Sequence, residues 1–299
     1  MTMPNFLIIG TQKAGTTAIN YYLKEHPQIY MSPTKEPGFF DFEGESVNFC
    51  GPGDEYSYRF AINDISAYRN LFRNVNDEVA IGEATTWYLQ SIKAPERIKY
   101  YIPNVKLIVI LRNPVDRAYS AFLHAMRDNR EPIDDFAQAL DEEDKRIKSN
   151  WGFLWRYKYM GFYATQLKRY FKLFDRNQIK VYLFEDYKNN PTEILKDIFH
   201  FLNVDETFTS EIVTPKNISG IPKSKALYTF LRKNNSVKSF FKPFIPSRFR
   251  KQMISQLMQK NMLKPTRSLE IQLKLREIFR EDILELQELL QRDLSKWLK

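Results

Sequence analysis

A cation and three hydroxyl groups lie in one short segment near the N-terminus, Gly10-Thr-Gln-Lys-Ala-Gly-Thr-Thr17. An apolar run precedes the segment and predicts a buried strand, and a helical pattern follows it. A strand, a glycine-bounded loop and a helix bring backbone N–H groups and a helix N-terminus together around a phosphate. The segment therefore predicts a phosphate-binding loop with a single lysine, Lys13.

The place of this lysine bears on the kind of phosphate chemistry. Gly10 and Gly15 have the spacing of the nucleotide-triphosphatase motif G-x-x-x-x-G-K-[ST]. Thr16 stands where that motif has its lysine, and Lys13 lies inside the loop instead. This departure disfavours a magnesium-dependent ATP or GTP enzyme. A nucleotide or small-molecule kinase of the P-loop type remains the alternative.

A second cation follows another apolar run. The segment 105–111 contains six aliphatic residues and one lysine, which is typical of a buried parallel strand. Arg112 comes next, and Ser120 lies on the helix that Pro114 is expected to begin. The guanidinium fork suits bidentate contact with phosphate, and parallel sheets bind ligands beyond the carboxyl ends of their strands. An ion pair between Arg112 and Asp116 is the structural alternative.

Both segments resemble motifs of one enzyme family. Residues 11–17 resemble the 5′-phosphosulfate loop of sulfotransferases that use 3′-phosphoadenosine 5′-phosphosulfate (PAPS), and residues 107–120 resemble their 3′-phosphate motif. The flanking sequence is most similar to heparan-sulfate-type and bacterial members. The resemblance implies an α/β fold of the P-loop nucleoside-triphosphatase type, with helices around a parallel central sheet. It also implies sulfuryl transfer from PAPS to a hydroxyl, or an amine, of a carbohydrate, glycolipid or secondary metabolite.

The resemblance also implies roles for individual residues. Lys13 would stabilise charge on the leaving phosphate, the loop after it would hold the 5′-phosphate, and Arg112 with Ser120 would hold the 3′-phosphate. Lys260 stands where the family has a Lys-Gly-Arg cofactor loop, but Asn and Met follow it here. The expected contacts with PAPS come from Lys13, Ala14, Gly15, Thr16, Thr17, Arg112, Ser120 and Lys260.

Two side chains compete for the role of general base. Glu83 resembles the catalytic glutamate of heparan-type sulfotransferases, although Ala84 replaces the usual Lys or Ser after it. His124 lies one helical turn after Ser120 and matches a histidine of the N-deacetylase/N-sulfotransferase relatives. A structural ion pair is the alternative role for Glu83. Lys35 and Lys93 resemble residues that line the acceptor cleft, or they are exposed to solvent.

Composition predicts one α/β domain over residues 1–299. There is no linker-like stretch and no run of 18 apolar residues, and Cys50 is the single cysteine. The first strand begins by residue 6, so we expect no signal peptide and a cytoplasmic protein. No spacing of Cys or His suggests a metal site. The sequence leaves the oligomeric state open.

The net charge of +9 is concentrated near the C-terminus. Residues 212–269 hold thirteen Lys or Arg and no Asp or Glu. This segment is expected either to attract a polyanion, such as PAPS, a sulfated glycan or a membrane surface, or to be a solvated region. Interleaved aromatic residues would suit contact with nucleic acid or lipid, but a small amphipathic lid is the preferred interpretation. The helical period of residues 157–174 predicts a helix there. Residues 269–298 predict a long amphipathic helix, or a helix pair, that packs on the sheet rather than in a coiled coil.

Overall fold

A five-stranded parallel sheet forms the centre of the molecule. The structure is a computed structural model that describes residues 2–209, 220–232, 256–257, 260–263 and 265–299. All neighbouring strands of this sheet are parallel, as the family resemblance implied. In the order in which they lie side by side, the strands are β2 (Ile29–Met31), β3 (Ala80–Ala84), β1 (Phe6–Gly10), β4 (Lys106–Leu111) and β5 (Ile179–Leu183).

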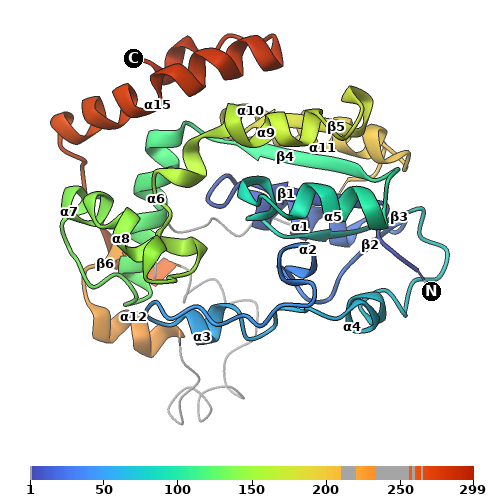
Figure 1. The fold of residues 1–299 in the computed structure, drawn as a ribbon, viewed down its shortest axis with the longest axis horizontal. Helices are drawn as coiled ribbons and strands as arrows, with labels where there is room; N and C mark the ends of the chain where they lie inside the picture. Colours follow the sequence, from blue (N-terminus) through green and yellow to red (C-terminus); the bar gives the residue numbers. More distant parts are fainter. Residues whose placement is uncertain (1, 210–219, 233–255, 258–259, 264) are drawn as a thin grey trace.

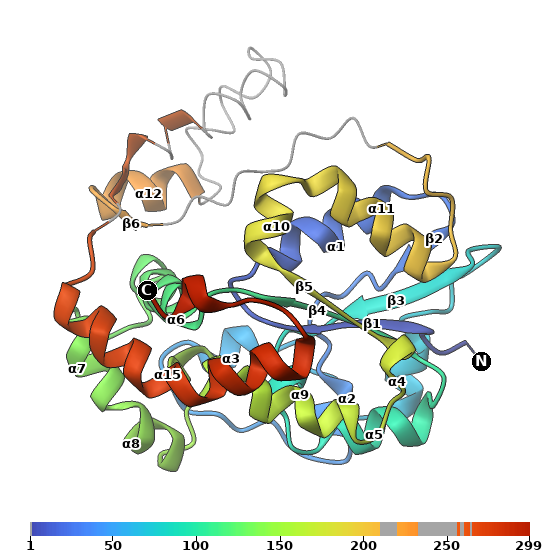
Figure 2. The same ribbon diagram turned by 90° about the horizontal axis from the view of Figure 1, so that it is seen from above.

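Helices cover both faces of this sheet, which Figure 2 shows nearly edge-on. One face carries α1 (Thr16–Glu25), α10 (Phe184–Asn189) and α11 (Pro191–Leu202). The other carries α2 (Phe39–Phe42), α5 (Ala94–Tyr101), α9 (Tyr163–Phe171) and α6 (Pro114–Arg127). The remaining elements include α3 (Asp54–Ser57), α4 (Ile65–Asn70), α7 (Phe136–Asp141), α8 (Glu143–Lys148), α12 (Lys225–Arg232), α15 (Leu269–Leu290) and the hairpin of β6 (Ile221–Pro222) and β7 (Met262–Leu263).

The carboxyl ends of β1 and β4 lie next to each other in the sheet. The two strands are direct neighbours, and the Thr11 N–H after β1 donates to the Ile110 carbonyl at 2.8 Å. Helix α6 begins right after β4 because Asn113 caps it and Pro114 occupies its first turn. The segments that follow the two strands therefore begin side by side.

One predicted helix is shorter in the structure. The sequence pattern predicted a helix over residues 157–174, but α9 begins at Tyr163 and ends at Phe171. The carboxylate of Asp282 accepts hydrogen bonds from the N–H groups of Ala164 (2.9 Å) and Thr165 (3.1 Å) and so fixes where the helix begins. Residues 159–161 form a separate 3-10 turn.

The C-terminal helix α15 packs on other helices. It contacts α9 and α6, which themselves cover the sheet, so it adds an outer layer instead of lying directly on the strands (Figure 1). The helix ends at Leu290, earlier than the predicted 298. Its apolar stripe joins the main core through Leu275, Phe279, Ile283 and Leu286.

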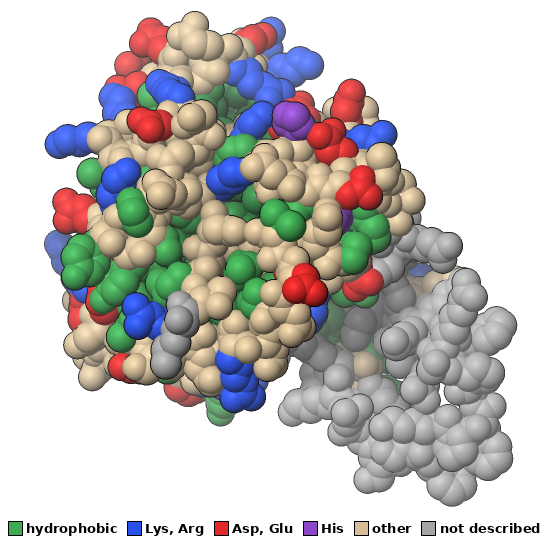
Figure 3. Space-filling view, turned by 90° about the vertical axis from the view of Figure 1, so that its right-hand side faces the viewer, with side chains coloured by type: hydrophobic (Ala, Val, Ile, Leu, Met, Phe, Trp, Pro, Cys, Tyr) green, Lys and Arg blue, Asp and Glu red, His purple; other side chains and the backbone are tan. Residues whose placement is uncertain are grey.

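Much of the basic segment 212–269 falls outside the described residues, so the predicted lid stays a prediction. Its described C-terminal end is attached to α6. Tyr119 donates a hydrogen bond to the Pro265 carbonyl (2.9 Å), and Arg267 pairs with Asp116 (2.5 Å). Within the described ranges no helix is long and apolar enough to cross a membrane. On the face drawn in Figure 3, acidic and basic side chains surround an area with more apolar side chains.

Candidate active site

The loop after β1 has the backbone shape of an anion-binding turn. Lys13 and Gly15 both have positive φ, 73° and 88°. A Cβ at Gly15 would lie 3.2 Å from the ring of Phe184, a tight contact, so both the positive φ and the limited space favour glycine. No side chain caps the first turn of α1 within the described structure. Its N–H groups are therefore left for an anion, as a helix N-terminus favours.

Arg112 lies directly against this loop. Its Nη1 donates a hydrogen bond to the Lys13 carbonyl oxygen at 3.0 Å, and its Cζ is 5.0 Å from the centre of the Phe184 ring. Tyr163 donates to the Arg112 carbonyl at 2.9 Å and fixes the backbone there. Asp116 pairs with Arg267 instead of forming the ion pair considered for Arg112. The structure thus brings together the two cations that the sequence predicted at one site.

The positive charges make protonation of Lys13 unfavourable. Burial, together with the guanidinium groups of Arg127 and Arg112, lowers the pKa of Lys13 to about 7. An anion bound in the loop would stabilise the protonated amine and raise this pKa. The electrostatics of the site therefore favour a negatively charged ligand.

Helix α6 adds Ser120 and His124 to the same region. Ser120 is buried, and His124 lies one turn later on the same face. Burial lowers the pKa of His124 to about 4, and the positive charge of Lys13 contributes to the shift. His124 Nε2 lies 3.4 Å from Asp128 Oδ2. The predicted His124 and Lys13 are therefore electrostatically coupled.

Glu83 is fully buried near the end of β3. Its carboxylate accepts hydrogen bonds from the hydroxyl groups of Thr85 (2.8 Å) and Tyr68 (3.3 Å). Burial raises the pKa of Glu83 to about 7, despite these hydrogen bonds. A carboxyl group with such a pKa can accept a proton near neutral pH. No contact in the described structure joins Glu83 to Lys13, so its part in the site stays a prediction.

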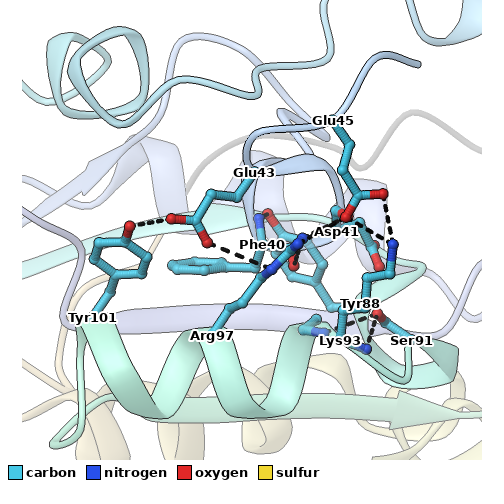
Figure 4. A network of polar contacts seen from close by, with 10 residues as sticks. Phe40, Asp41, Glu43, Glu45, Tyr88, Ser91, Lys93, Arg97 and Tyr101 are labelled. Atoms are coloured by element: carbon cyan, nitrogen blue, oxygen red, sulfur yellow. Dashed lines mark hydrogen bonds and ion pairs between the residues drawn. The ribbon is translucent and has the colours of Figure 1, made fainter.

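The three other predicted lysines lie in different surroundings. Lys35 pairs with Glu36 at 2.9 Å, and its positive charge also lowers the pKa of Lys13. Lys93 binds Glu45, with 2.6 Å between Nζ and Oε2, in the polar network of Figure 4. Lys260 is exposed, next to the β6–β7 hairpin. Of these three lysines, Lys35 is the one whose charge contributes to the lowered pKa of Lys13.

The remaining loop residues differ in exposure. Ala14 and Thr16 are buried, whereas the Thr17 side chain is exposed.

Two charged residues of this region were missed in the sequence. Arg127 and Asp128, at the end of α6, both influence the pKa of Lys13. Asp128 follows His124 by four residues, the spacing at which His124 follows Ser120, and this repetition is a signal that could have found it. A buried carboxyl at Asp41 was missed as well. Burial raises the pKa of Asp41 to about 7, and Figure 4 shows it beside the Lys93 network.

Side chains that could bind a metal ion do not gather into a site in the part of the chain that the structure describes. Across the described residues, no group of three or more His, Cys, Asp or Glu side chains is arranged to hold a metal ion.

Comparison with known proteins places this geometry in a family. The family described as "Sulfotransferase domain" matches residues 3–263. A solved structure, a sulfotransferase from Alicyclobacillus acidocaldarius, is 32% identical, covers 100% of both chains and superposes with a TM-score of 0.79. Mouse sulfotransferase SULT7A1, solved with PAP, is 16% identical with a TM-score of 0.50 over 95% of this chain and 84% of that one, a likeness of fold alone.

The curated relatives are longer proteins. Human bifunctional heparan sulfate N-deacetylase/N-sulfotransferase 2 is 29% identical over 210 residues, which are 68% of this chain and 22% of that protein. Membrane-associated sulfotransferase kil1 of Dictyostelium discoideum is 32% identical over 122 residues, 41% of this chain and 23% of the relative. The chain thus spans about a fifth of the length of the curated relatives it matches. Its parallel sheet and glycine loop are those of the P-loop-like fold, and the chain belongs to the sulfotransferase domain family.

Proposed function

We propose that this chain transfers a sulfuryl group from PAPS to a hydroxyl group, or an amine, of an acceptor and releases adenosine 3′,5′-bisphosphate. The proposal depends most on one observation, the hydrogen bond from Arg112 to the carbonyl of Lys13. It means that two cations from adjacent strand ends adjoin one uncapped helix N-terminus. A nucleotide with phosphates at both its 5′ and 3′ positions has the charge to match them.

Each cation has a separate part in this proposal. Lys13 binds the 5′-phosphosulfate and stabilises the negative charge that develops on the phosphate oxygen as the S–O bond breaks. The N–H groups around Gly15 hold the 5′-phosphate. Arg112, with Ser120 on α6, binds the 3′-phosphate. This group distinguishes PAPS from nucleotides with a 5′-phosphate only. PAP in the mouse structure is consistent with such a ligand.

The acceptor must lose a proton as its oxygen attacks sulfur. We propose that Glu83 takes this proton, since burial raises its pKa to about 7. Its carboxylate is covered by Tyr68 and Thr85, so acceptor binding has to displace these hydrogen bonds. His124 is the competing base, and its electrostatic coupling to Lys13 is the observation that favours it.

The class of acceptor is proposed from the relatives. The curated relatives include heparan sulfate N-sulfotransferases, and cationic residues such as Lys35 lie near Lys13. A hydroxyl or an amine of a carbohydrate or glycolipid fits this setting, and a secondary metabolite is a further option. Contact of the acceptor with the basic segment 212–269 is part of the same proposal.

The donor can be tested directly. Purified protein is incubated with a panel of glycan and small-molecule hydroxyl acceptors, and with either ³⁵S-labelled PAPS or γ-³²P-labelled ATP and Mg²⁺. We expect label transfer from PAPS without added metal, and no transfer from ATP. Transfer from ATP alone would establish the kinase alternative.

Arg117→Lys is not a suitable control variant, because Arg117 is buried and donates hydrogen bonds to the backbone carbonyls of residues 156 and 157. The informative variant is Lys13→Met, which removes the proposed loop cation. Its matched control is Lys274→Met, because Lys274 is an exposed lysine paired with Asp141.

A further inference from the structure

Asp128 ends helix α6 in a position to contact two side chains of the site. Its Oδ2 lies 3.4 Å from Nε2 of His124, and its Oδ1 accepts a hydrogen bond from Nε of Arg127 at 3.1 Å. Its N–H donates to the His124 carbonyl at 3.1 Å, so the backbone keeps the two residues together. Each oxygen of this carboxylate thus has a neighbour of its own.

The contact with Asp128 favours one tautomer of His124. An ionised carboxylate only accepts hydrogen bonds, so its Oδ2, 3.4 Å from Nε2, favours a proton on that nitrogen. Burial lowers the pKa of His124 to about 4. The ring is therefore neutral at pH 7, and Nδ1 keeps its lone pair. This Nδ1 is buried and has no hydrogen-bond partner among the described residues. His124 therefore presents a single proton-accepting atom.

The same carboxylate acts on Lys13. Of the charges that most affect Lys13, Asp128 is the negative one: it raises the pKa of the amine, whereas burial and the charges of Arg127, Arg112 and Lys35 lower it. Burial opposes the ionisation of Asp128, but hydrogen bonds with His124 and Arg127 lower its pKa below the ordinary value. Asp128 is thus an anion at neutral pH, in contact with the histidine and near the lysine.

We propose that Asp128 is a positioning residue of the sulfuryl-transfer site: its carboxylate holds His124 in the Nε2–H form and leaves Nδ1 as the proton-accepting atom near Lys13. This inference rests on the proposed function for its catalytic consequence, but its structural part does not. It names a histidine–aspartate pair within one helical turn, and it defines Nδ1 as the atom through which His124, the competing base, would accept a proton.

The tautomer can be measured without any acceptor. The chain has three histidines, so the side-chain ¹⁵N spectrum of labelled protein is simple, and His124→Gln assigns the signals of residue 124. In the wild-type protein we expect a protonated Nε2 and an unprotonated Nδ1 from pH 5.5 to 8. A protonated Nδ1 in the wild-type protein would overturn the proposal.

Asp128→Asn is the informative variant because it preserves shape. Arg127 Nε holds Oδ1 at 3.1 Å, so an amide here would keep its oxygen toward Arg127 and turn its NH₂ group toward His124 Nε2. Nε2 would then become the acceptor, and the proton would move to Nδ1. We expect the ¹⁵N spectrum to show this change in Asp128→Asn and not in Asp141→Asn, a matched charge loss at an exposed ion pair. An unchanged tautomer in Asp128→Asn would overturn the proposal.

Kinetics separate positioning from mere support of the fold. For Asp128→Asn we expect kcat to fall about 10- to 100-fold while KM for PAPS changes less than about threefold, as for other residues that orient a catalytic group. Asp128→Glu should recover part of kcat. Equal loss of kcat in Asp128→Asn and Asp128→Glu with an unchanged tautomer would show a structural role only. If wild-type protein does not bind adenosine 3′,5′-bisphosphate, the proposed function fails, while the ¹⁵N spectra still decide on the pair.

Discussion

The guanidinium of Arg112 donates a hydrogen bond to the main-chain carbonyl of Lys13, with 3.0 Å between Nη1 and the oxygen. The two residues are 99 positions apart in the chain and meet because β1 and β4 are neighbours in the sheet. This bond sets the positively charged Arg112 beside the loop while leaving its other N–H groups for a ligand. In the proposed function, this bond is the structural basis for binding both ends of one nucleotide.

The buried ammonium group of Lys13 is expected to lower the free energy of unfolding, although the proposed function needs it. Burial lowers the pKa of Lys13 to about 7 from an ordinary value of 10.5, so the protonated amine is disfavoured in the folded state. Its cost to the unfolding free energy is complete below pH 7 and fades as the pH rises toward 10.5. Lys13→Met should therefore melt at or above the wild-type temperature at pH 6, with a smaller difference at pH 9, while PAPS-dependent transfer falls at least about 100-fold.

Differential scanning calorimetry at the two pH values tests the stability part. Lys274→Met, which removes an exposed lysine, should change neither the pH trend nor the transfer rate. A Lys13→Met variant that melts well below wild type at pH 6 would contradict the account of a disfavoured ammonium group.

The raised pKa of Glu83 predicts the opposite dependence of the unfolding free energy on pH. Its pKa is raised to about 7 from 4.5, so between these values the folded state binds more protons than the unfolded state. Wild-type stability should therefore decrease as the pH rises through this window. Glu83→Gln cannot ionise and does not lose this stability. The variant's free energy of unfolding minus that of wild type should therefore be about 1–3 kcal/mol larger at pH 8 than at pH 5. Urea unfolding at both pH values measures this difference.

The kinetic effect of Glu83→Gln decides between the two candidate bases. If Glu83 takes the proton, kcat should fall about 100-fold or more, whereas His124→Gln should have a smaller effect. The reverse ranking would assign the proton to His124. Tyr68→Phe, which removes one hydrogen bond to Glu83, controls for changes in the carboxylate's surroundings.

Asp282 is expected to matter for stability and not for binding. Its carboxylate accepts three hydrogen bonds from residues 164 and 165 and so joins α15 to the start of α9. Asp282→Ala should lower the unfolding free energy by about 2–4 kcal/mol, because two backbone donors of α9 lose their partner. Asp293→Ala, which removes one exposed hydrogen bond to the Ser295 N–H near the C-terminus, should cost less than about 1 kcal/mol. Equal effects of the two changes in urea unfolding would contradict this role.

Local signals were sufficient for much of the sheet and its helices. The apolar run before Arg112 predicted β4 within one residue, and the start of α6 follows from Pro114 and the Asn113 cap. Helix α1 is as predicted, since Gly15 ends the loop and a helical pattern follows. These features depend on residues that are close together in the sequence.

Long-range contacts account for what the sequence did not show. The predicted helix over 157–174 is interrupted because Asp282, more than a hundred residues later, caps a new helix at residue 164. The burial of Glu83 under Tyr68 depends on how distant loops pack on the sheet. The approach of Arg112 to Lys13 likewise depends on strand order, which periodicity alone does not determine. The sequence suggested which side chains form the candidate site but not their hydrogen bonds.

Calorimetric titration with adenosine 3′,5′-bisphosphate and with adenosine 5′-monophosphate tests the central claim most directly. If Arg112 and the Lys13 loop bind opposite ends of one nucleotide, the bisphosphate should bind at least about 30-fold more tightly, and Arg112→Ala should reduce this preference to about threefold or less. Binding of the monophosphate should change little in that variant. Equal affinity of the wild-type protein for both nucleotides, or a preference that survives Arg112→Ala, would contradict the account.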